Sequence, residues 1–217
     1  MKPRLNIESL CIEAYKFSVQ ESLHQEASLY GKSSSKSIGT YLEHKFKAEL
    51  STHYEYVEGN SAYGVDLLEL GVDIKVTSLK QPQSSCPYRD AAQKIYGLGY
   101  HLLIFVYEKY DDHDEKTVRL DMKHTIFVNR ERTADYQTTR GLLDILRRDG
   151  NEDDISAFLL ERNLPVDEIG ANQLAARIIQ TPPIEGYLTV SNALQWRLQY
   201  KRVIQQAGLI SGIRRVR

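Results

Sequence analysis

One segment in the first half of the chain alternates between apolar and polar residues at every position. It reads V-D-I-K-V-T over residues 72–77. Successive side chains of a β-strand point to opposite faces, so this pattern predicts a strand with an apolar face toward the core. Asp73 and Lys75 then stand side by side on the other face. The chain must therefore contain a sheet that buries one side of this strand and leaves a carboxylate beside an ammonium group.

The residues just before this strand contain a second acid. Residues 63–70 read Y-G-V-D-L-L-E-L, and Gly71 separates them from the alternating segment. We interpret the two segments as short strands joined by a tight hairpin at Gly71, which brings Asp66 close to Asp73. Two carboxylates and a lysine at the edge of a sheet can hold a divalent metal ion beside a phosphate group.

This arrangement resembles the PD-(D/E)xK nuclease superfamily, which includes most type II restriction endonucleases and many repair nucleases. The matching residues are G-V-D at 64–66 and D-I-K at 73–75, with Val65 in place of the usual proline. The resemblance covers roughly residues 37–110. It implies an α/β fold in which helices flank a mixed β-sheet core of the restriction-endonuclease type, and it implies a metal site with Asp66 and Asp73 as ligands and Lys75 as a catalytic residue.

The segment before the hairpin predicts a helix over residues 38–51, because Ile38, Leu42, Phe46 and Leu50 recur at helical spacing. Glu43 lies next to this apolar stripe. In many members of the superfamily the corresponding helix contributes an acid to the metal site, and Glu43 is the matching position. The alternative is that Glu43 is a solvated acid paired with Lys47 one turn later.

Periodicity and turn residues predict the other elements of the core, which we assign to a first domain at residues 1–135. Helices are expected at 5–30 and 88–98, and strands at 54–58, 100–107 and 117–129. The strand at 100–107 is almost entirely apolar, as a strand covered on both faces requires. The acidic run D-D-H-D-E at 111–115 is interpreted as a turn rather than a metal site.

Residues 136–217 are predicted to be mainly helical and to serve DNA binding or dimerisation. Helices are expected at 141–148, 155–163, 168–180 and 191–207, and the last two, separated by two prolines, suggest a helix-turn-helix-like unit. No acid follows Trp196, and arginine, glutamine and lysine suit base edges and phosphates. The alternative is a surface helix with a basic tail and a buried Trp196. The candidate DNA-binding residues are Arg89, Arg197, Gln199, Lys201, Arg202, Arg214 and Arg215.

Composition argues against a membrane span, a secretion signal and a disulfide-rich fold. No apolar run reaches the roughly 20 residues of a membrane span, and the start of the sequence has no apolar signal region. Two isolated cysteines predict neither a disulfide framework nor a thiolate zinc site and fit a reducing cytoplasm. The net charge of −1 does not exclude nucleic-acid binding, because local basic patches rather than the total charge determine phosphate binding. The G-K-S at 31–33 lacks the first glycine of a phosphate loop, so no nucleotide cofactor is expected.

The resemblance implies a Mg²⁺-dependent, sequence-specific endonuclease of double-stranded DNA, most simply a type II restriction enzyme. It implies products with 5′-phosphate and 3′-hydroxyl ends and a homodimer with one site for each strand. A Holliday-junction resolvase, a RecB-like repair nuclease and a non-catalytic DNA-binding regulator are the alternatives. The acid that completes the metal site is left open among Glu43, Glu55, Glu58 and Glu69.

Overall fold

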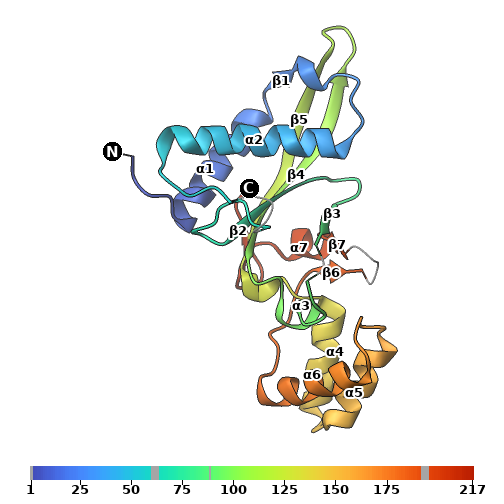
Figure 1. Cartoon of the computed structure of the whole chain (residues 1–217). Coiled ribbons are helices and arrows are strands. Elements are labelled where there is room, and N and C mark those ends of the chain that lie inside the picture. The colour runs from blue at the N-terminus through green and yellow to red at the C-terminus, as the bar shows by residue number, and fades with distance from the viewer. Residues whose placement is uncertain (1, 60–63, 88, 192–195) are drawn as a thin grey trace.

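Two β-sheets and the helices that pack against and beyond them make up the described part of the fold (Figure 1). The computed structural model describes residues 2–59, 64–87, 89–191 and 196–217. Several sequence predictions therefore lie in part outside the described residues. These are the start of the first hairpin strand at Tyr63, the helix start at Tyr88, and residues 192–195 of the predicted last helix.

The main sheet has the strand order β1-β5-β4-β2, and β8 pairs with β5 beside this path. Its strands are β1 (Gln25–Glu26), β2 (Val72–Ser78), β4 (His101–Asp112), β5 (Thr117–Val128) and β8 (Ile213–Arg215). Strand β2 runs parallel to β4, whereas the other pairs are antiparallel, so the sheet is mixed. The α/β fold class with a mixed sheet is confirmed, and β2 lies at the edge of the sheet.

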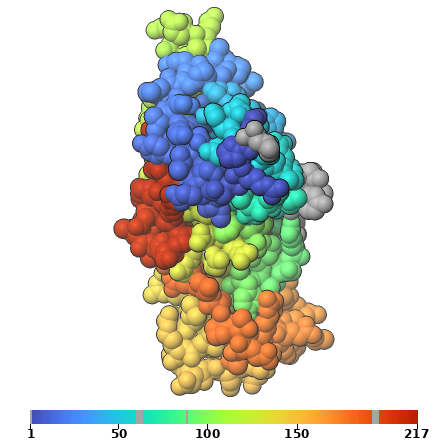
Figure 2. All heavy atoms as spheres, turned by 90° about the vertical axis from the view of Figure 1, so that its left-hand side faces the viewer, coloured from blue at the N-terminus to red at the C-terminus, as the bar shows by residue number. Residues whose placement is uncertain are grey.

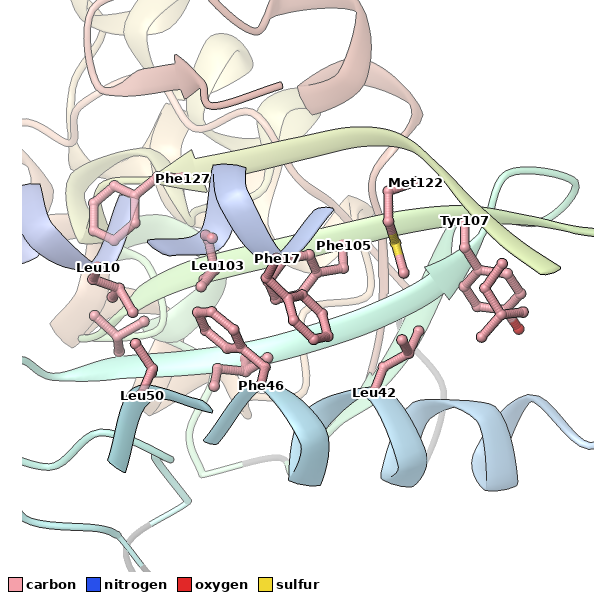
Figure 3. Close-up of a cluster of buried hydrophobic side chains, with 14 of the residues drawn as sticks. Leu10, Phe17, Leu42, Phe46, Leu50, Leu103, Phe105, Tyr107, Met122 and Phe127 are labelled. Atoms are coloured by element: carbon pink, nitrogen blue, oxygen red, sulfur yellow. The ribbon is translucent and has the colours of Figure 1, made fainter. Parts of the chain in front are cut away.

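The two N-terminal helices, α1 (Ile7–Glu21) and α2 (Ser35–His53), cover one face of the main sheet (Figures 1 and 3). Phe17 of α1, Phe46 of α2 and Phe105 of β4 meet with ring centroids 5.1 to 5.6 Å apart. Strand β4 alternates its side chains between this core and a second core on the opposite face, since Phe105 belongs to the first and Ile104 to the second. The prediction of a strand buried on both faces is confirmed.

The first helix is shorter than predicted, because α1 ends at Glu21 rather than at Tyr30. The chain then forms β1, which pairs with Arg119 and Val118 of β5, and the short 3₁₀ helix η1 (Ala27–Leu29). The backbone of β1 gains partners only because the edge of β5 lies beside it. This pairing with a distant segment ended the helix, and local periodicity did not reveal it.

A small second sheet, with the order β3-β7-β6, packs on the other face of the main sheet. Its strands are β3 (Gln83–Cys86), β6 (Thr189–Val190) and β7 (Trp196–Gln199). The prediction of one helix over residues 191–207 is wrong, because residues 196–199 form β7, and α7 (Lys201–Gln206) is the only helix among the residues of this range that the structure describes. Trp196 and Leu198, two residues apart, both point into the second core. Burying alternate side chains in this way requires a strand, and this burial outweighs the local tendency to form a helix. The helix-turn-helix-like unit is therefore not formed.

A third core lies among short helices that follow the sheets, at the lower end of Figure 1. They are α3 (Gln93–Tyr96), α4 (Tyr136–Arg147), α5 (Glu152–Glu161) and α6 (Glu168–Gln180), with the 3₁₀ helix η2 (Arg130–Arg132) leading into α4. The mainly helical character of the C-terminal part is confirmed. The division of the chain at residue 135 stays a prediction; β8 joins the C-terminal part to the main sheet by pairing with β5.

Two smaller predictions have different outcomes. Residues 54–58 form only isolated bridges, from Glu55 to Arg4 and from Glu58 to Leu67, so the predicted edge strand is wrong. The acidic run is the tight turn of the β4–β5 hairpin, as predicted, because Asp112 pairs with Thr117 across it.

Across the described ranges, none of the helices is both long and apolar enough to cross a membrane.

Candidate active site

The edge strand β2 places Asp73 and Lys75 side by side on one face. Val72 and Ile74 point the other way and are buried against α2 in the first core. The Lys75 Nζ lies 2.7 Å from Asp73 Oδ2, and Asp73 is only 6% exposed. The alternation read from the sequence therefore produces a buried ion pair. It lies on the face of the main sheet that also carries the small sheet, because the neighbouring β4 residue Leu102 belongs to the second core.

A tight turn brings Asp66 to this pair. Leu67 and Val72 exchange backbone hydrogen bonds of 2.9 and 3.2 Å, and Gly71 has φ +59, a conformation in which glycine has no steric cost. The residues before the turn make only isolated bridges, so the first strand of the predicted hairpin is wrong although the turn is present. The Asp66 Oδ2 accepts a 2.7 Å hydrogen bond from the Ile74 amide, and the Asp66 and Asp73 carboxyl groups are close enough to shift each other's pKa.

Glu43 on α2 is connected to the same site through a lysine. The Lys47 Nζ lies 2.8 Å from Glu43 Oε1 and 2.6 Å from Asp66 Oδ1. The helical ion pair expected as the alternative for Glu43 is therefore present, and it also touches the candidate site. Sequence reasoning missed Lys47 as a member of the site. The available signal was its position one turn after Glu43 on the helix face that borders the apolar stripe.

The other three glutamates make contacts elsewhere. Glu69 lies 4.0 Å from the guanidinium of Arg4, and the backbone of Glu55 also pairs with Arg4. Glu58 accepts a 3.3 Å hydrogen bond from the Tyr56 hydroxyl. Of the four acids left open by the sequence, Glu43 is thus the one that shares a charged partner with Asp66 in the described residues.

The pKa values of the two aspartates are shifted in opposite directions, upward by burial at Asp73 and downward by hydrogen bonds at Asp66. Burial, together with the neighbouring Asp66, raises the pKa of Asp73 to about 7, although Lys75 acts against this increase. Burial also acts to raise the pKa of Asp66, but hydrogen bonds from Asp73, Lys47 and the Ile74 amide hold that pKa below its usual value. Of the two carboxyl groups, Asp73 therefore holds its proton to the higher pH.

The residues present fit a divalent metal ion with few protein ligands. Within the described ranges, no three His, Cys, Asp or Glu side chains are arranged to hold a metal. Mg²⁺ needs no such cage, because it is commonly bound through one or two carboxylates and keeps several waters. The ammonium groups of Lys47 and Lys75 supply positive charge to the Asp66–Asp73 pair. A divalent cation can supply the same charge.

Four of the predicted DNA-binding residues lie near this site, on the small sheet or at the start of α7. The Arg89 Nη2 is 3.1 Å from the position that a β-carbon would take on Gly64, two residues before Asp66. Arg197 and Gln199 are exposed on β7, and Lys201 is exposed at the start of α7. These positions leave all four side chains on surfaces that a nucleic acid can approach.

The other three predicted DNA-binding residues contact the protein itself. Arg214 forms a bidentate pair with Glu8 at 2.6 and 2.9 Å, beside α1 (Figure 2, where the red C-terminal segment adjoins the blue N-terminal helix). The Arg215 Nε donates a 3.2 Å hydrogen bond to the Ala207 carbonyl. The Arg202 guanidinium stacks 3.6 Å from the centre of the Tyr136 ring. Their DNA contacts stay predictions, with these internal partners as competitors.

Gly59 is essential for the position of Asp66. A β-carbon at this residue would lie 1.7 Å from the Val65 carbonyl oxygen, and the Gly59 amide donates a 2.9 Å hydrogen bond to the Asp66 carbonyl. We expect Gly59→Ala to displace the Asp66 segment and to lower the catalytic rate of the site by about 10- to 100-fold. A single-turnover rate measurement shows the effect. Gly39→Ala is the control, because a β-carbon there meets its nearest atom at an ordinary 4.0 Å; equal rates for both variants would contradict the prediction.

Comparison with known proteins shows the family to which this chain belongs. Residues 4–215 match the model of the family described as Type II restriction enzyme NspV. The chain therefore belongs to this family of type II restriction enzymes, which are site-specific deoxyribonucleases. A curated relative is the Type II restriction enzyme NspV of Nostoc sp. (strain ATCC 29411 / PCC 7524). It is 57% identical over 209 residues, which cover 96% of this chain and 95% of the relative. No solved structure matches the chain.

Proposed function

We propose that the protein is a Mg²⁺-dependent, sequence-specific endonuclease of double-stranded DNA that leaves 5′-phosphate and 3′-hydroxyl ends. The observation that carries this proposal is the convergence of Asp66, Asp73 and Lys75 at the edge strand. Type II restriction enzymes generally need a divalent metal, and the oxygen ligands at this site favour Mg²⁺ over softer ions.

Each residue of the site has a distinct role in this proposal. Asp66 and Asp73 are the metal ligands, and Glu43, linked to Asp66 through Lys47, completes the acidic site. When bound, Mg²⁺ neutralises phosphate charge and makes an attacking water more acidic. Lys75 stays protonated because the pKa of its ammonium is raised by Asp73, which outweighs the effect of burial. Its N–H groups orient the attacking water or donate to the scissile phosphate.

The substrate has two strands, and each chain contributes one such site. We therefore propose a homodimer whose two-fold axis matches that of the duplex. Arg89, beside Gly64, is placed to contact the backbone near the scissile phosphate. Both cysteines are free and buried, which fits an enzyme that works in the reducing cytoplasm. Sedimentation of the purified protein alone tests the dimer, and a stable monomer at micromolar concentration would contradict it.

The decisive experiment is digestion of unmethylated plasmid and phage DNA with the purified protein, in Mg²⁺ and in EDTA. Discrete fragments that require Mg²⁺ are expected, with ends that DNA ligase rejoins. Ligation reports the 5′-phosphate and 3′-hydroxyl directly. A Mg²⁺-dependent smear, or cutting confined to branched duplexes, would instead support the repair-nuclease or junction-resolvase alternative. Family membership assigns the chain to enzymes, so the non-catalytic regulator is not carried further.

Lys47 is expected to compete with the metal ion for the same acids. Its ammonium lies 2.6 Å from Asp66 and 2.8 Å from Glu43, so its removal leaves a more negative site. We expect Lys47→Met to tighten Mg²⁺ binding by about tenfold. The repulsion between a partly buried ammonium group and a bound Mg²⁺ ion costs roughly 1 kcal/mol or more, and the substitution removes it. Isothermal titration with Mg²⁺ measures this change.

The matched control for this experiment is Lys45→Met. Lys45 lies on the same helix and pairs with Glu21 at 2.7 Å, outside the candidate site. Its variant should bind Mg²⁺ like the wild type. Weaker Mg²⁺ binding in Lys47→Met would show that the lysine supports the metal site rather than competing for it.

A further inference from the structure

A second polar surface lies on the small sheet. Strands β3 and β7 pair Gln83 with Gln199 and Ser85 with Arg197, and directly opposite residues of an antiparallel pair point to the same face. Thr189 of β6 also pairs with Gln199. We call the surface formed by these five side chains the outer face. It presents one guanidinium, two amides and two hydroxyls, and β3, β6 and β7 contain no Asp or Glu.

The opposite side of the same strands is anchored in the protein. Cys86, Trp196 and Leu198 are each at most 1% exposed and belong to the second core. The hydroxyl groups of Ser84 and Tyr200 lie 2.5 Å apart beneath the sheet. Side chains carried by a well-packed strand are held more precisely than those on a loop. The outer face is therefore a firm platform for polar recognition.

The outer face is tied to the strand that carries the acidic site. Thr77 follows Lys75 by two residues on β2, so both side chains share one face. The Thr77 Oγ1 accepts a 2.9 Å hydrogen bond from the Gln83 amide and lies 3.1 Å from the Gln83 carbonyl oxygen, to which it can donate. One threonine thus holds the start of β3 beside the strand that carries Asp73 and Lys75.

A basic hollow lies between β2 and β3. It has a volume of about 560 Å³, and among the described residues that line it are Lys36, Lys80 and Arg197 but no carboxylate. Such a surface attracts phosphate groups. The hollow is lined by β2, which carries the acidic site, and by β3, which carries part of the outer face, so a backbone bound there lies beside both strands.

We propose that the outer face reads the DNA sequence from the major groove, a role that rests on the proposed function. The major groove admits a two-stranded β-ribbon, so strands can enter it without a recognition helix. The guanidinium of Arg197 suits the O6 and N7 acceptors of guanine, and the amide of Gln199 suits N6 and N7 of adenine. Lys36 and Lys80 in the hollow hold phosphates and carry no sequence information.

Selection from a randomised duplex library tests this assignment without cleavage. The wild-type protein and its variants are incubated with the library in Ca²⁺, and the bound duplexes are sequenced. We expect the wild type to enrich one sequence. Arg197→Lys should lose discrimination at a G·C pair and Gln199→Ala at an A·T pair, each by about 5- to 150-fold, because each removes one bidentate base contact. Arg197→Lys keeps the positive charge, so its binding to unrelated duplexes should be unchanged.

Three further variants separate base reading from other causes. Lys80→Ala should weaken binding to all sequences alike and lower the salt dependence of affinity. Arg148→Ala and Gln173→Ala, both exposed in the helical part, should leave the enriched sequence unchanged. Enrichment of the wild-type sequence by both outer-face variants would overturn the proposal and leave the proposed nuclease intact. A wild type that enriches nothing would also overturn it, and the Mg²⁺ digest then decides separately whether the nuclease stands.

Discussion

Asp73→Asn is expected to cleave DNA at least about 10³-fold more slowly than the wild type while still binding it. The substitution keeps the shape of the side chain but removes the charge that the metal ion and Lys75 both require, and losses of this size follow the removal of one charged group that acts in the transition state. Single-turnover cleavage of a plasmid in saturating Mg²⁺ measures the rate. A filter-binding assay of the same duplexes in Ca²⁺ measures binding.

A matched control shows that the effect belongs to the site. Asp153→Asn changes an exposed acid in the first turn of α5 and should cleave at the wild-type rate. If Asp73→Asn kept more than a tenth of the wild-type rate, Asp73 would not be a metal ligand. The assignment of the site to β2 would then fail, although the family membership of the chain would stand.

The same substitution is expected to make the metal-free protein more stable at alkaline pH. The pKa of Asp73 rises from 3.8 to about 7 on folding, so the native state binds more protons than the unfolded chain between these two values. The wild type therefore loses stability as the pH rises from about 4 to 7, and Asn avoids this loss. At about 1.4 kcal/mol per pKa unit, Asp73→Asn should exceed the wild type by about 2 to 4 kcal/mol above pH 7 and by little near pH 4.

Urea unfolding in EDTA at pH 4, 6 and 8 measures this difference. Asp153→Asn should show no such pH-dependent gain, because its side chain is exposed. Saturating Mg²⁺ should stabilise the wild type and leave Asp73→Asn almost unchanged, since only the wild type offers both carboxylates. An Asp73→Asn protein less stable than the wild type at pH 8 would mean that the bond to Lys75 outweighs the cost of burying the charge.

If Asp73→Asn loses cleavage but gains stability, the acidic site needed for catalysis lowers the stability of the fold. Without a metal ion, the buried Asp73 and the half-buried Asp66 are kept in the structure by the surrounding core and by the ammonium groups of Lys47 and Lys75. Active sites commonly carry such a cost, because groups selected for chemistry are not those that pack best. A surface ion pair such as that of Arg214 with Glu8 has no comparable effect on stability in either direction.

The sequence by itself determined the parts of the protein that depend on local periodicity. The alternation at 72–77 gave β2 with Asp73 and Lys75 on one face, and the spacing of Leu42, Phe46 and Leu50 gave α2. Gly71 marked the turn that brings Asp66 back to β2. Each of these features is set by side-chain direction along one element or by one turn, so a single sequence suffices to find it.

The tertiary structure alone decided which distant groups meet. Lys47 contacts Asp66 because the fold places α2 beside the Asp66 segment. Helix α1 ends at Glu21 because Gln25 and Glu26 pair with the edge of β5. Trp196 and Leu198 already alternated with polar residues, but four residues are too few to show a strand until a buried partner surface exists. Pairing and burial between distant segments outweigh local propensity, because they bring far more apolar area and backbone hydrogen bonding than one short segment can supply.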